Sequence, residues 1–474
     1  MLACTAGARA ERPLFSPNQM AMIDGRPRLI IGLYEHLSDE DRLAEVAAAG
    51  FNLIQCPADP AALDRVHKHG LYAWINLGEP LNLQGEVDTK RAELLATVNR
   101  FRNHPALLVW EGPDEPLWNV YWSRHQYFTN REFPAMRDAA KARTRDRQEV
   151  EALIRLCRQW YDRTQWKAFE ASRDAVWKRL GTQAPQPETR MSTLSEDARR
   201  HGDGLTRGFE AVRKADPDHI LWLNHAPRNS LASLRHFNRG VDMAGCDIYP
   251  VPFNLRVGHS DLSDRNLTSV GAYTDRMRAA APGKAVAMVL QGFGWRDLGK
   301  SEPKDPEIGR RPTRHESRVM AYEAIVHGAS AVLYWGTAYV EKNSRLWGDL
   351  LAVTRELRAL EPAIVAPAVT PAPRCVADAS VGSIDDQVPV IALRKVDDDY
   401  VLIAVNEQVH GVTFTVSGLP RELAGRTLYT LYSDEARTVD AQDFRDGMRA
   451  LDVHVYATSR RFEVPEGGRR PEVQ

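Results

Sequence analysis

The sequence predicts an α/β fold: a (β/α)8 barrel with a helical insertion after its fourth strand, followed by a small all-β sandwich domain. Three observations predict this fold. From residue 28, short apolar runs alternate with amphipathic stretches, which is typical of parallel strands joined by crossover helices. The alternation stops once, because residues 117–200 contain no strand pattern. After Pro362 the pattern changes to short strands of alternating polarity.

Eight apolar runs are expected to form the barrel. Helices between them have recognisable ends, such as the helix over 39–50, which finishes in glycine. Eight strands in strict alternation with helices make an open, doubly wound sheet the weaker choice, and no Gly-x-Gly-x-x-Gly or Walker loop occurs. The expected strands are residues 28–35, 51–57, 71–78, 106–111, 220–224, 242–249, 285–291 and 331–335.

The insertion over about 117–200 is predicted to be helical, since its apolar residues recur at helical spacing. It begins directly after Glu115-Pro116, so it must emerge over the rim of the barrel. Aromatic residues are frequent at its start, including Trp118, Tyr121 and Trp122. Two interpretations stay open: these residues form one wall of a binding cleft, or they pack the insertion onto the barrel.

The chain is expected to divide into a leader (1–19), a barrel (20–365) and an antiparallel β-sandwich (366–474). Ala8-Arg9-Ala10 looks like a small-x-small cleavage site, although a basic start and a long apolar core are missing. The leader is therefore either a clipped export signal or a disordered segment. The first interpretation predicts a periplasmic or secreted protein.

Charge and composition narrow the class of protein. Of 474 residues, 62 are Lys or Arg and 63 are Asp or Glu, and this balance argues against a dedicated nucleic-acid binder. No run approaches the roughly 20 apolar residues of a membrane span. The five cysteines are scattered without any Cys-x-x-Cys pair, so neither a zinc site nor a disulfide framework is expected. We expect no cofactor.

The chemistry of a barrel lies at the C-terminal ends of its strands. The side chains expected there combine carboxylates, amides and aromatic rings, without a cluster of metal ligands. Sugars need this mixture, because rings stack on C–H surfaces, polar groups bind hydroxyls, and glycosidases usually use two carboxyl groups. Each group alone could be structural, and His225 fits a polar rim residue better than a metal ligand. The expected rim residues are Tyr34, Glu35, His36, Trp74, Asn76, Glu111, Asp114, Glu115, Asn224, His225, Asp247, Tyr249, Gln291, Trp295, Tyr334 and Trp335.

One segment carries a family resemblance. Residues 104–116, His-Pro-Ala-Leu-Leu-Val-Trp-Glu-Gly-Pro-Asp-Glu-Pro, resemble the clan-A-like retaining (β/α)8 glycoside hydrolases whose fourth strand ends in Asn-Glu-Pro, and more closely their Asp-Glu-Pro subgroup. The similarity covers about residues 20–365, and the trailing domain resembles the small sandwich often attached to these barrels. The resemblance implies that Glu115 is the acid/base and that Asp114 contacts the sugar hydroxyl beside the anomeric carbon. The charge of Asp114 would favour a protonated Glu115, which suits a proton donor.

The sequence departs from this clan at strand seven. The clan places its nucleophilic glutamate there, but this chain has Gln291. Three explanations stay open: another carboxylate acts as general base of an inverting reaction, the substrate assists, or the barrel binds sugar without cleaving it. We favour the first, with Asp247 ahead of Glu35 and Glu111, because Asp247 and Tyr249 face the same side of the sheet. An inverting pair would lie roughly 6.5–9.5 Å apart.

The expected substrate is therefore an oligo- or polysaccharide. An unrelated barrel enzyme, such as a lyase or aldolase, is the remaining alternative. No lysine is expected at a strand end for Schiff-base chemistry, and no phosphate-binding glycine run occurs near strands seven and eight.

Overall fold

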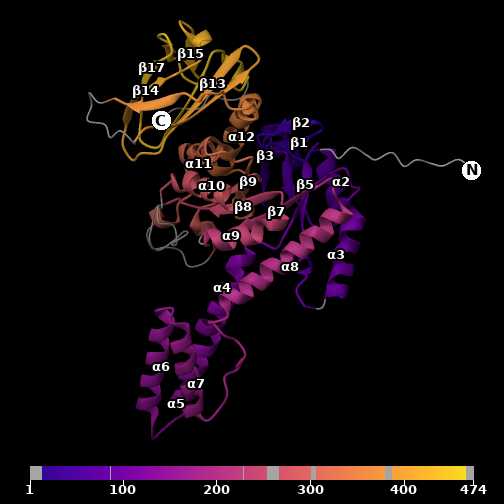
Figure 1. The fold of residues 1–474 in the computed structure, drawn as a ribbon, viewed down its shortest axis with the longest axis vertical. Helices are drawn as coiled ribbons and strands as arrows, with labels where there is room; N and C mark the ends of the chain where they lie inside the picture. The colour runs from indigo at the N-terminus through magenta and orange to yellow at the C-terminus, as the bar shows by residue number, and fades with distance from the viewer. Residues whose placement is uncertain are drawn as a thin grey trace, which may run out of the picture.

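The computed structural model describes residues 13–85, 87–227, 229–252, 266–299, 306–378 and 387–465. Three parts follow one another along the chain (Figure 1): a barrel, a helical arm inserted into it, and a C-terminal β domain. Residues 1–12, which form most of the predicted leader, lie outside the described residues. Within the described ranges no helix is both long and apolar enough to cross a membrane.

Eight parallel strands close the barrel in the order β10-β3-β4-β5-β6-β7-β8-β9. The predicted fold class is confirmed. Four of the eight strands are buried along their whole length, because helices cover the outside and side chains fill the inside. The strands are β3 (Ile30–Leu33), β4 (Leu53–Gln55), β5 (Tyr72–Asn76), β6 (Leu107–Glu111), β7 (Ile220–His225), β8 (Met243–Ile248), β9 (Ala285–Gln291) and β10 (Ala331–Trp335).

The helices around the barrel begin and end at recognisable caps. Asp39 accepts a hydrogen bond from the backbone N–H of Arg42 at 2.9 Å, and Gly50 ends the same helix with φ 103°. The barrel helices are α1 (Glu40–Ala49), α2 (Pro60–Lys68), α3 (Val87–Phe101), α8 (Leu194–Ala215), α9 (Leu231–Phe237), α10 (Ser269–Ala280), α11 (Arg314–Val326) and α12 (Arg345–Ile364). A hairpin of β1 (Ala21–Ile23) and β2 (Arg26–Arg28) precedes the first barrel strand.

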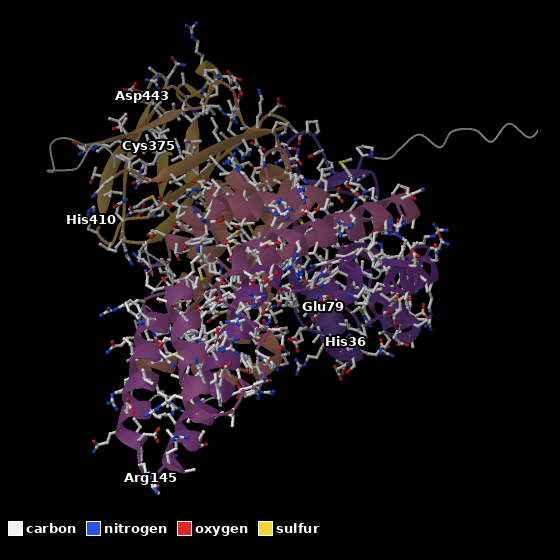
Figure 2. The ribbon with its side chains drawn as sticks, turned by 60° about the horizontal axis from the view of Figure 1, so that its bottom comes forward. His36, Glu79, Arg145, Cys375, His410 and Asp443 are labelled. Carbon is white, nitrogen blue, oxygen red and sulfur yellow. The ribbon has the colours of Figure 1, made fainter. Side chains whose placement is uncertain are left out.

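The insertion forms an arm that α4 and α8 connect to the barrel (Figure 1). It has its own hydrophobic core, which includes Phe128, Phe133 and Phe169. Figure 2 shows Arg145, in the turn between α5 and α6, at the outer end of this arm. The arm contains α4 (Pro116–Tyr127), the π-helix η2 (Phe128–Glu132), α5 (Phe133–Lys141), α6 (Arg147–Asp162) and α7 (Trp166–Leu180).

The C-terminal domain contains two antiparallel sheets, β11-β14-β17 and β12-β13-β18-β15-β16. Strands β11, β16 and β17 were not predicted: the first two have only three or four residues and no buried position, and β17 carries charged residues and a glycine. The strands are β11 (Arg374–Ala377), β12 (Val390–Val396), β13 (Asp399–Asn406), β14 (Val412–Ser417), β15 (Thr427–Thr430), β16 (Ala436–Thr438), β17 (Phe444–Met448) and β18 (Asp452–Ala457).

The barrel and the C-terminal domain share one hydrophobic core. Val401 and Ile403 of β13 belong to the same buried cluster as Val319 and Leu357 on barrel helices α11 and α12. The opposite face of this sheet packs on the three-stranded sheet in a second cluster, which includes Leu402 and Phe414. The five-stranded sheet is therefore apolar on both faces, and one of them holds the domain against the barrel.

Candidate active site

The backbone after β6 turns sharply at Glu115. This residue has φ 44° and ψ 45°, the left-handed region, and it precedes Pro116, the first residue of α4. A non-glycine residue in this region costs on the order of 1 kcal/mol or more, and such strain gathers at functional sites. The turn holds Glu115 half-exposed at the C-terminal end of the barrel strands. His36 and Glu79, which are labelled in Figure 2, follow β3 and β5 at this same end, and Glu79 begins the short helix η1 (Glu79–Leu81).

Glu111, at the end of β6, is completely buried. Its carboxylate accepts hydrogen bonds from the hydroxyl of Tyr34, from Trp74 Nε1 at 3.0 Å and from Asn76 Nδ2 at 2.9 Å. Burial raises its pKa well above the usual range, and the nearby charges of Asp114 and Asp247 add to this shift. Glu111 thus lies at the base of the site, and protein donors occupy both of its carboxylate oxygens.

Asn224 joins the two carboxylates above this floor. Its Nδ2 donates to Asp114 Oδ1 at 3.0 Å and also to Asp247 Oδ1. Tyr249 donates to the other oxygen of Asp247 at 2.8 Å. The three strands β6, β7 and β8 therefore bring Asp114, Asn224 and Asp247 into one hydrogen-bonded group.

The carboxylates also act on one another through their charges. Burial raises the pKa of Asp247 well above its usual range, and the charges of Glu115 and then Asp114 raise it further. Loss of surrounding water also raises the pKa of Asp114, although this side chain is open to solvent on one side. The negative charges of Glu115 and Asp114 thus favour the protonated form of Asp247.

Aromatic rings form a wall beside Asp247. The rings of Tyr249 and Trp335 are stacked at 5.5 Å with an angle of 20° between their planes. Phe293 contacts both edge-on, at 5.2 and 5.1 Å, and Trp295 lies 5.1 Å from Phe293. Trp295 and Trp335 are partly exposed, and Tyr339, 5.9 Å from Trp335, is more exposed still. The wall offers apolar ring faces to a ligand at the mouth.

Below the carboxylates the barrel is filled by aromatic rings. Tyr34, Trp74 and Trp222 meet edge-to-face with centroid distances of 5.1, 5.5 and 5.5 Å. Trp74 and Trp222 are completely buried. Trp74 therefore supports the site from below, through its bond to Glu111, and does not present a ring face at the mouth.

Three predicted rim residues, Gln291, His225 and Glu35, make polar contacts with groups outside the carboxylate cluster. The amide of Gln291 donates to the carbonyls of Val251 and Phe293 and accepts from the Val251 N–H at 2.9 Å. Buried His225 bonds Asn238 at 2.8 Å, and burial lowers its pKa to about 4. Glu35 pairs with Lys342 at 2.7 Å. These contacts favour structural roles, and a substrate-binding role for these residues stays a prediction.

Three stacked rings, those of Trp118, Trp122 and His125, form a ladder that extends along α4 from the site into the arm. Trp118 and Trp122 are stacked at 5.8 Å with 20° between their planes, and His125 stacks on Trp122 at 5.3 Å. Trp122 is 40% exposed. Other rings of the insertion, such as Phe128 and Phe133, pack in the core of the arm, and a cleft-lining role for the exposed ladder stays a prediction.

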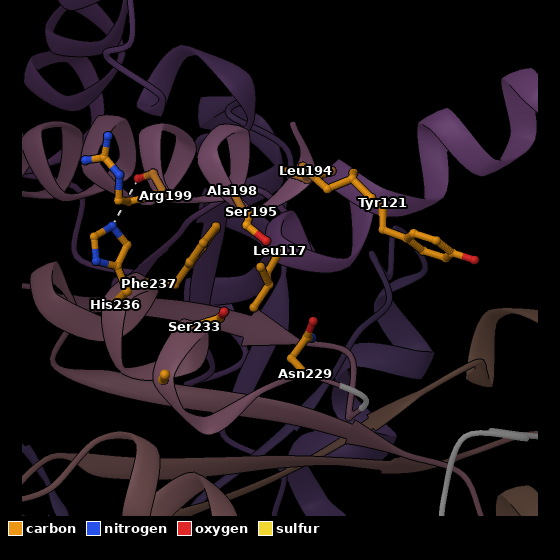
Figure 3. A pocket seen from close by; sticks show the side chains of 12 residues that line it. Leu117, Tyr121, Leu194, Ser195, Ala198, Arg199, Asn229, Ser233, His236 and Phe237 are labelled. Atoms are coloured by element: carbon orange, nitrogen blue, oxygen red, sulfur yellow. Dashed lines mark hydrogen bonds between the residues drawn. The ribbon is translucent and has the colours of Figure 1, made fainter. Parts of the chain in front are cut away.

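A cavity of about 370 Å³ lies next to this ladder, between α4, α8 and α9 (Figure 3). Tyr121 lies at one end, and Arg199 and His236 lie at the other, where His236 Nε2 is 3.0 Å from the Arg199 carbonyl oxygen. None of the rim carboxylates lines it. The cavity is thus distinct from the carboxylate cluster, and sequence patterns did not predict it.

The structure adds Phe293 to the predicted rim set, because this ring joins the aromatic wall. Tyr34, which was in the predicted set because it follows a barrel strand directly, bonds Glu111. Phe293 follows Gln291 by two residues and had no signal of its own, because an isolated phenylalanine after a strand usually serves packing.

Comparison with known proteins supports the fold. No protein-family profile matches the chain, and no curated protein matches its sequence. A solved structure described as a glycoside hydrolase aligns with a TM-score of 0.51 and 13% identity, over 94% of this chain and 96% of that chain. A catalytic mutant of Gan42B, a GH42 beta-galactosidase from G. stearothermophilus, aligns with a TM-score of 0.51 and 10% identity, over 94% and 99%. The chain therefore has the barrel fold and the C-terminal sheets of these glycoside hydrolases.

Proposed function

We propose that this chain is a glycoside hydrolase that cleaves an O-glycosidic bond in an oligo- or polysaccharide. One observation carries the proposal: Asn224 donates hydrogen bonds to both Asp114 and Asp247, which brings the turn that carries Glu115 and buried Asp247 together at the C-terminal end of the barrel strands. Two neighbouring carboxyl groups are the machinery that glycosidases use. The stacked Tyr249 and Trp335 beside them suit the apolar face of a sugar ring.

Glu115 is the proposed general acid. It is half-exposed, so a leaving-group oxygen can reach its carboxyl group. The charge of adjacent Asp114 would favour a protonated Glu115, from which a leaving-group oxygen at the mouth would take the proton. The backbone of Glu115 is strained, as is common at functional sites, and the turn fixes the direction of its side chain.

Asp247 is the proposed second carboxylate, acting as general base on water. Hydrogen bonds from Asn224 and Tyr249 hold both of its oxygens and favour its ionised form, against the burial and the neighbouring charges that raise its pKa. The two other candidates are less suited. Glu111 is completely buried under three donors, and Glu35 is paired with Lys342.

Sugar release by purified variants tests this proposal. We expect the wild type to hydrolyse at least one member of a panel of aryl glycosides and polysaccharides, and Glu115→Gln and Asp247→Asn to reduce its rate about 10²- to 10⁴-fold. Glu79→Gln, an exposed glutamate at the same end of the barrel, is the matched control and should keep full activity. NMR of the first anomer released tells inversion from retention. Full activity of Glu115→Gln would contradict the assignment.

A barrel that binds sugar without cleaving it is the second candidate. It is favoured by Gln291, which stands at the end of β9 with its amide bonded to backbone groups. In that case the wild type releases nothing from the panel, while wild type and Glu115→Gln bind the same glycan equally in calorimetry.

Export to the periplasm or the exterior is part of the proposal. It is supported by the cleavage-like Ala8-Arg9-Ala10 in the sequence and by the nature of a polysaccharide substrate. Fractionation of cells that express the native gene would test it.

A further inference from the structure

A second group of polar side chains lies where the barrel meets the C-terminal domain, on the outside of the barrel. Glu323 belongs to α11, His327 follows that helix, and Glu407 follows β13. One ligand atom from each of the three lies within 4.8 Å of the others. Glu323 is completely buried, whereas the side chains of His327 and Glu407 are 13% and 23% exposed. The group is thus enclosed and still reachable from one edge.

Asp275 of α10 fixes the orientation of the imidazole. His327 Nδ1 lies 2.9 Å from a carboxylate oxygen of Asp275. The other ring nitrogen, Nε2, faces Glu407 at 3.0 Å and Glu323 at 3.9 Å. Metal-binding histidines almost always use their second nitrogen in this way, on a carboxylate or carbonyl that orients the ring.

The two glutamates of the group also contact each other. One carboxyl oxygen of each lies within 4.8 Å of the other, and Glu323 is fully shielded from water. Two carboxylates repel each other in such a place unless a proton or a cation lies between them. The contact of two carboxyl groups therefore points to a positive partner at this position.

Gly271 of α10 makes room for the group. A Cβ at this position would lie 2.5 Å from Glu323 Oε2 and 2.6 Å from His327 Nε2. Because Gly271 has no side chain, the carboxylate and the imidazole can approach α10 while their ligand atoms converge.

We propose that Glu323, His327 and Glu407 bind one divalent transition-metal ion, for which Zn²⁺ is the best match. One imidazole and two carboxylates form a mixed nitrogen and oxygen set that suits zinc, with water as a fourth ligand. Ligand atoms about 3–4 Å apart are compatible with metal–ligand bonds of about 2.0–2.2 Å. The ion would connect α11 of the barrel to the end of β13, and Asp275 would orient the histidine. This inference is independent of glycoside hydrolysis.

Calorimetry on the full chain tests the site. The chain is dialysed against EDTA, then against metal-free buffer, and titrated with ZnCl₂ and separately with MnCl₂. We expect one saturable Zn²⁺ per chain, a Tm that rises with added Zn²⁺, and weaker binding of Mn²⁺. Glu407→Gln should weaken Zn²⁺ binding by more than tenfold, and Asp275→Asn by about 10- to 100-fold.

The matched control is Glu463→Gln in the same domain. Glu463 pairs with Arg460 at 2.8 Å, and its 24% exposure is close to that of Glu407. This variant should bind Zn²⁺ like the wild type. Circular dichroism checks that Glu407→Gln is folded. Asp275→Asn tests the site a second time, at a more exposed position where the substitution disturbs folding less. Absence of saturable Zn²⁺ binding, or equal binding by Glu407→Gln and wild type, would overturn the site and leave a protonated His327 as the positive partner.

Discussion

Tyr249 donates a 2.8 Å hydrogen bond to Asp247, and the same tyrosine ring is stacked on Trp335. One side chain therefore fixes a buried carboxylate and contributes to the aromatic wall beside it. The arrangement ties the proposed base to the surface on which a sugar would lie, so that a change at Tyr249 affects both parts of the site.

The first prediction concerns Tyr249→Phe, which keeps the ring and removes the hydroxyl. The hydrogen bond from Tyr249 lowers the pKa of Asp247, against the larger effects of burial and of Glu115 that raise it. Its loss raises this pKa further, so the acidic limb of the pH–rate profile moves to higher pH. We expect kcat to fall about tenfold, as for loss of a hydrogen bond to a charged group. A profile that keeps its acidic limb would contradict a base role for Asp247.

The second prediction separates the acid role of Glu115 from binding. Glu115→Ala should lose about 10²- to 10⁴-fold in kcat on substrates with a sugar leaving group. On 2,4-dinitrophenyl glycosides the loss should be much smaller, because this leaving group departs without a proton. Equal losses on both kinds of substrate, measured by initial rates, would argue against Glu115 as the proton donor.

A third prediction addresses the ring ladder on α4. If Trp122 lines the cleft, Trp122→Ala should raise KM for long oligosaccharides about fivefold, equivalent to roughly 1 kcal/mol, and leave KM for short aryl glycosides unchanged. Leu156→Ala, at a similarly exposed apolar position of the arm, is the control. Unchanged KM values across chain lengths would assign the ladder to packing.

The fourth prediction concerns the buried ion pair of the arm. Arg173 and Glu132 are both buried and bonded at 2.5 and 3.0 Å, and Trp177 Nε1 donates to the same carboxylate at 2.8 Å. Arg173→Met leaves the Glu132 charge buried, and we expect the arm to lose about 3–5 kcal/mol. Urea denaturation followed by arm tryptophan fluorescence measures this loss.

An exposed pair of the same arm provides the comparison for that variant. Arg147 and Glu151 are bonded at 2.7 Å but are 51% and 35% exposed, so Arg147→Met should cost less than about 1 kcal/mol. Similar costs for the two arginine variants would show that burial of the Arg173 pair is not what stabilises the arm.

The fifth prediction is a pH dependence of stability. Although burial lowers the pKa of His454, Asp446 and Asp452 raise it to about 9. Because folding raises this pKa, protonated His454 stabilises the fold fully below the unfolded-state pKa of about 6.5. This stabilisation is lost as the pH rises towards 9. His454→Gln should lower the Tm at pH 6, and the difference from wild type should vanish near pH 10. A constant difference across this range in differential scanning fluorimetry would rule the mechanism out.

Much of the fold was predictable because local patterns repeat. The barrel strands are continuous apolar runs between capped helices, so strand positions such as Ala285–Gln291 and Ala331–Trp335 follow from the chain itself. Strands β11 and β16 were not predicted, because short, half-exposed strands are stabilised by neighbouring strands and show no periodicity of their own.

The candidate site was predictable in part. Chain position alone placed Asp114, Glu115, Asp247 and Tyr249 at strand ends, because every parallel strand of a barrel delivers its last residues to the same face. Chain position did not predict the orientation of each side chain. Gln291 bonds backbone groups and Glu35 pairs with a distant lysine, and both outcomes depend on partners that are far away in sequence.

The sequence by itself determined the architecture and the candidate proton donor, since apolar periodicity and the Asp-Glu-Pro turn are local properties of the chain. The tertiary structure alone decided that Asn224 bonds both Asp114 and Asp247, which rings form the wall, and that Glu323 and His327 meet Glu407 across two domains. The physical reason is distance along the chain. Burial, hydrogen bonds and charge interactions join residues that only the closed barrel and its attached sheets bring together.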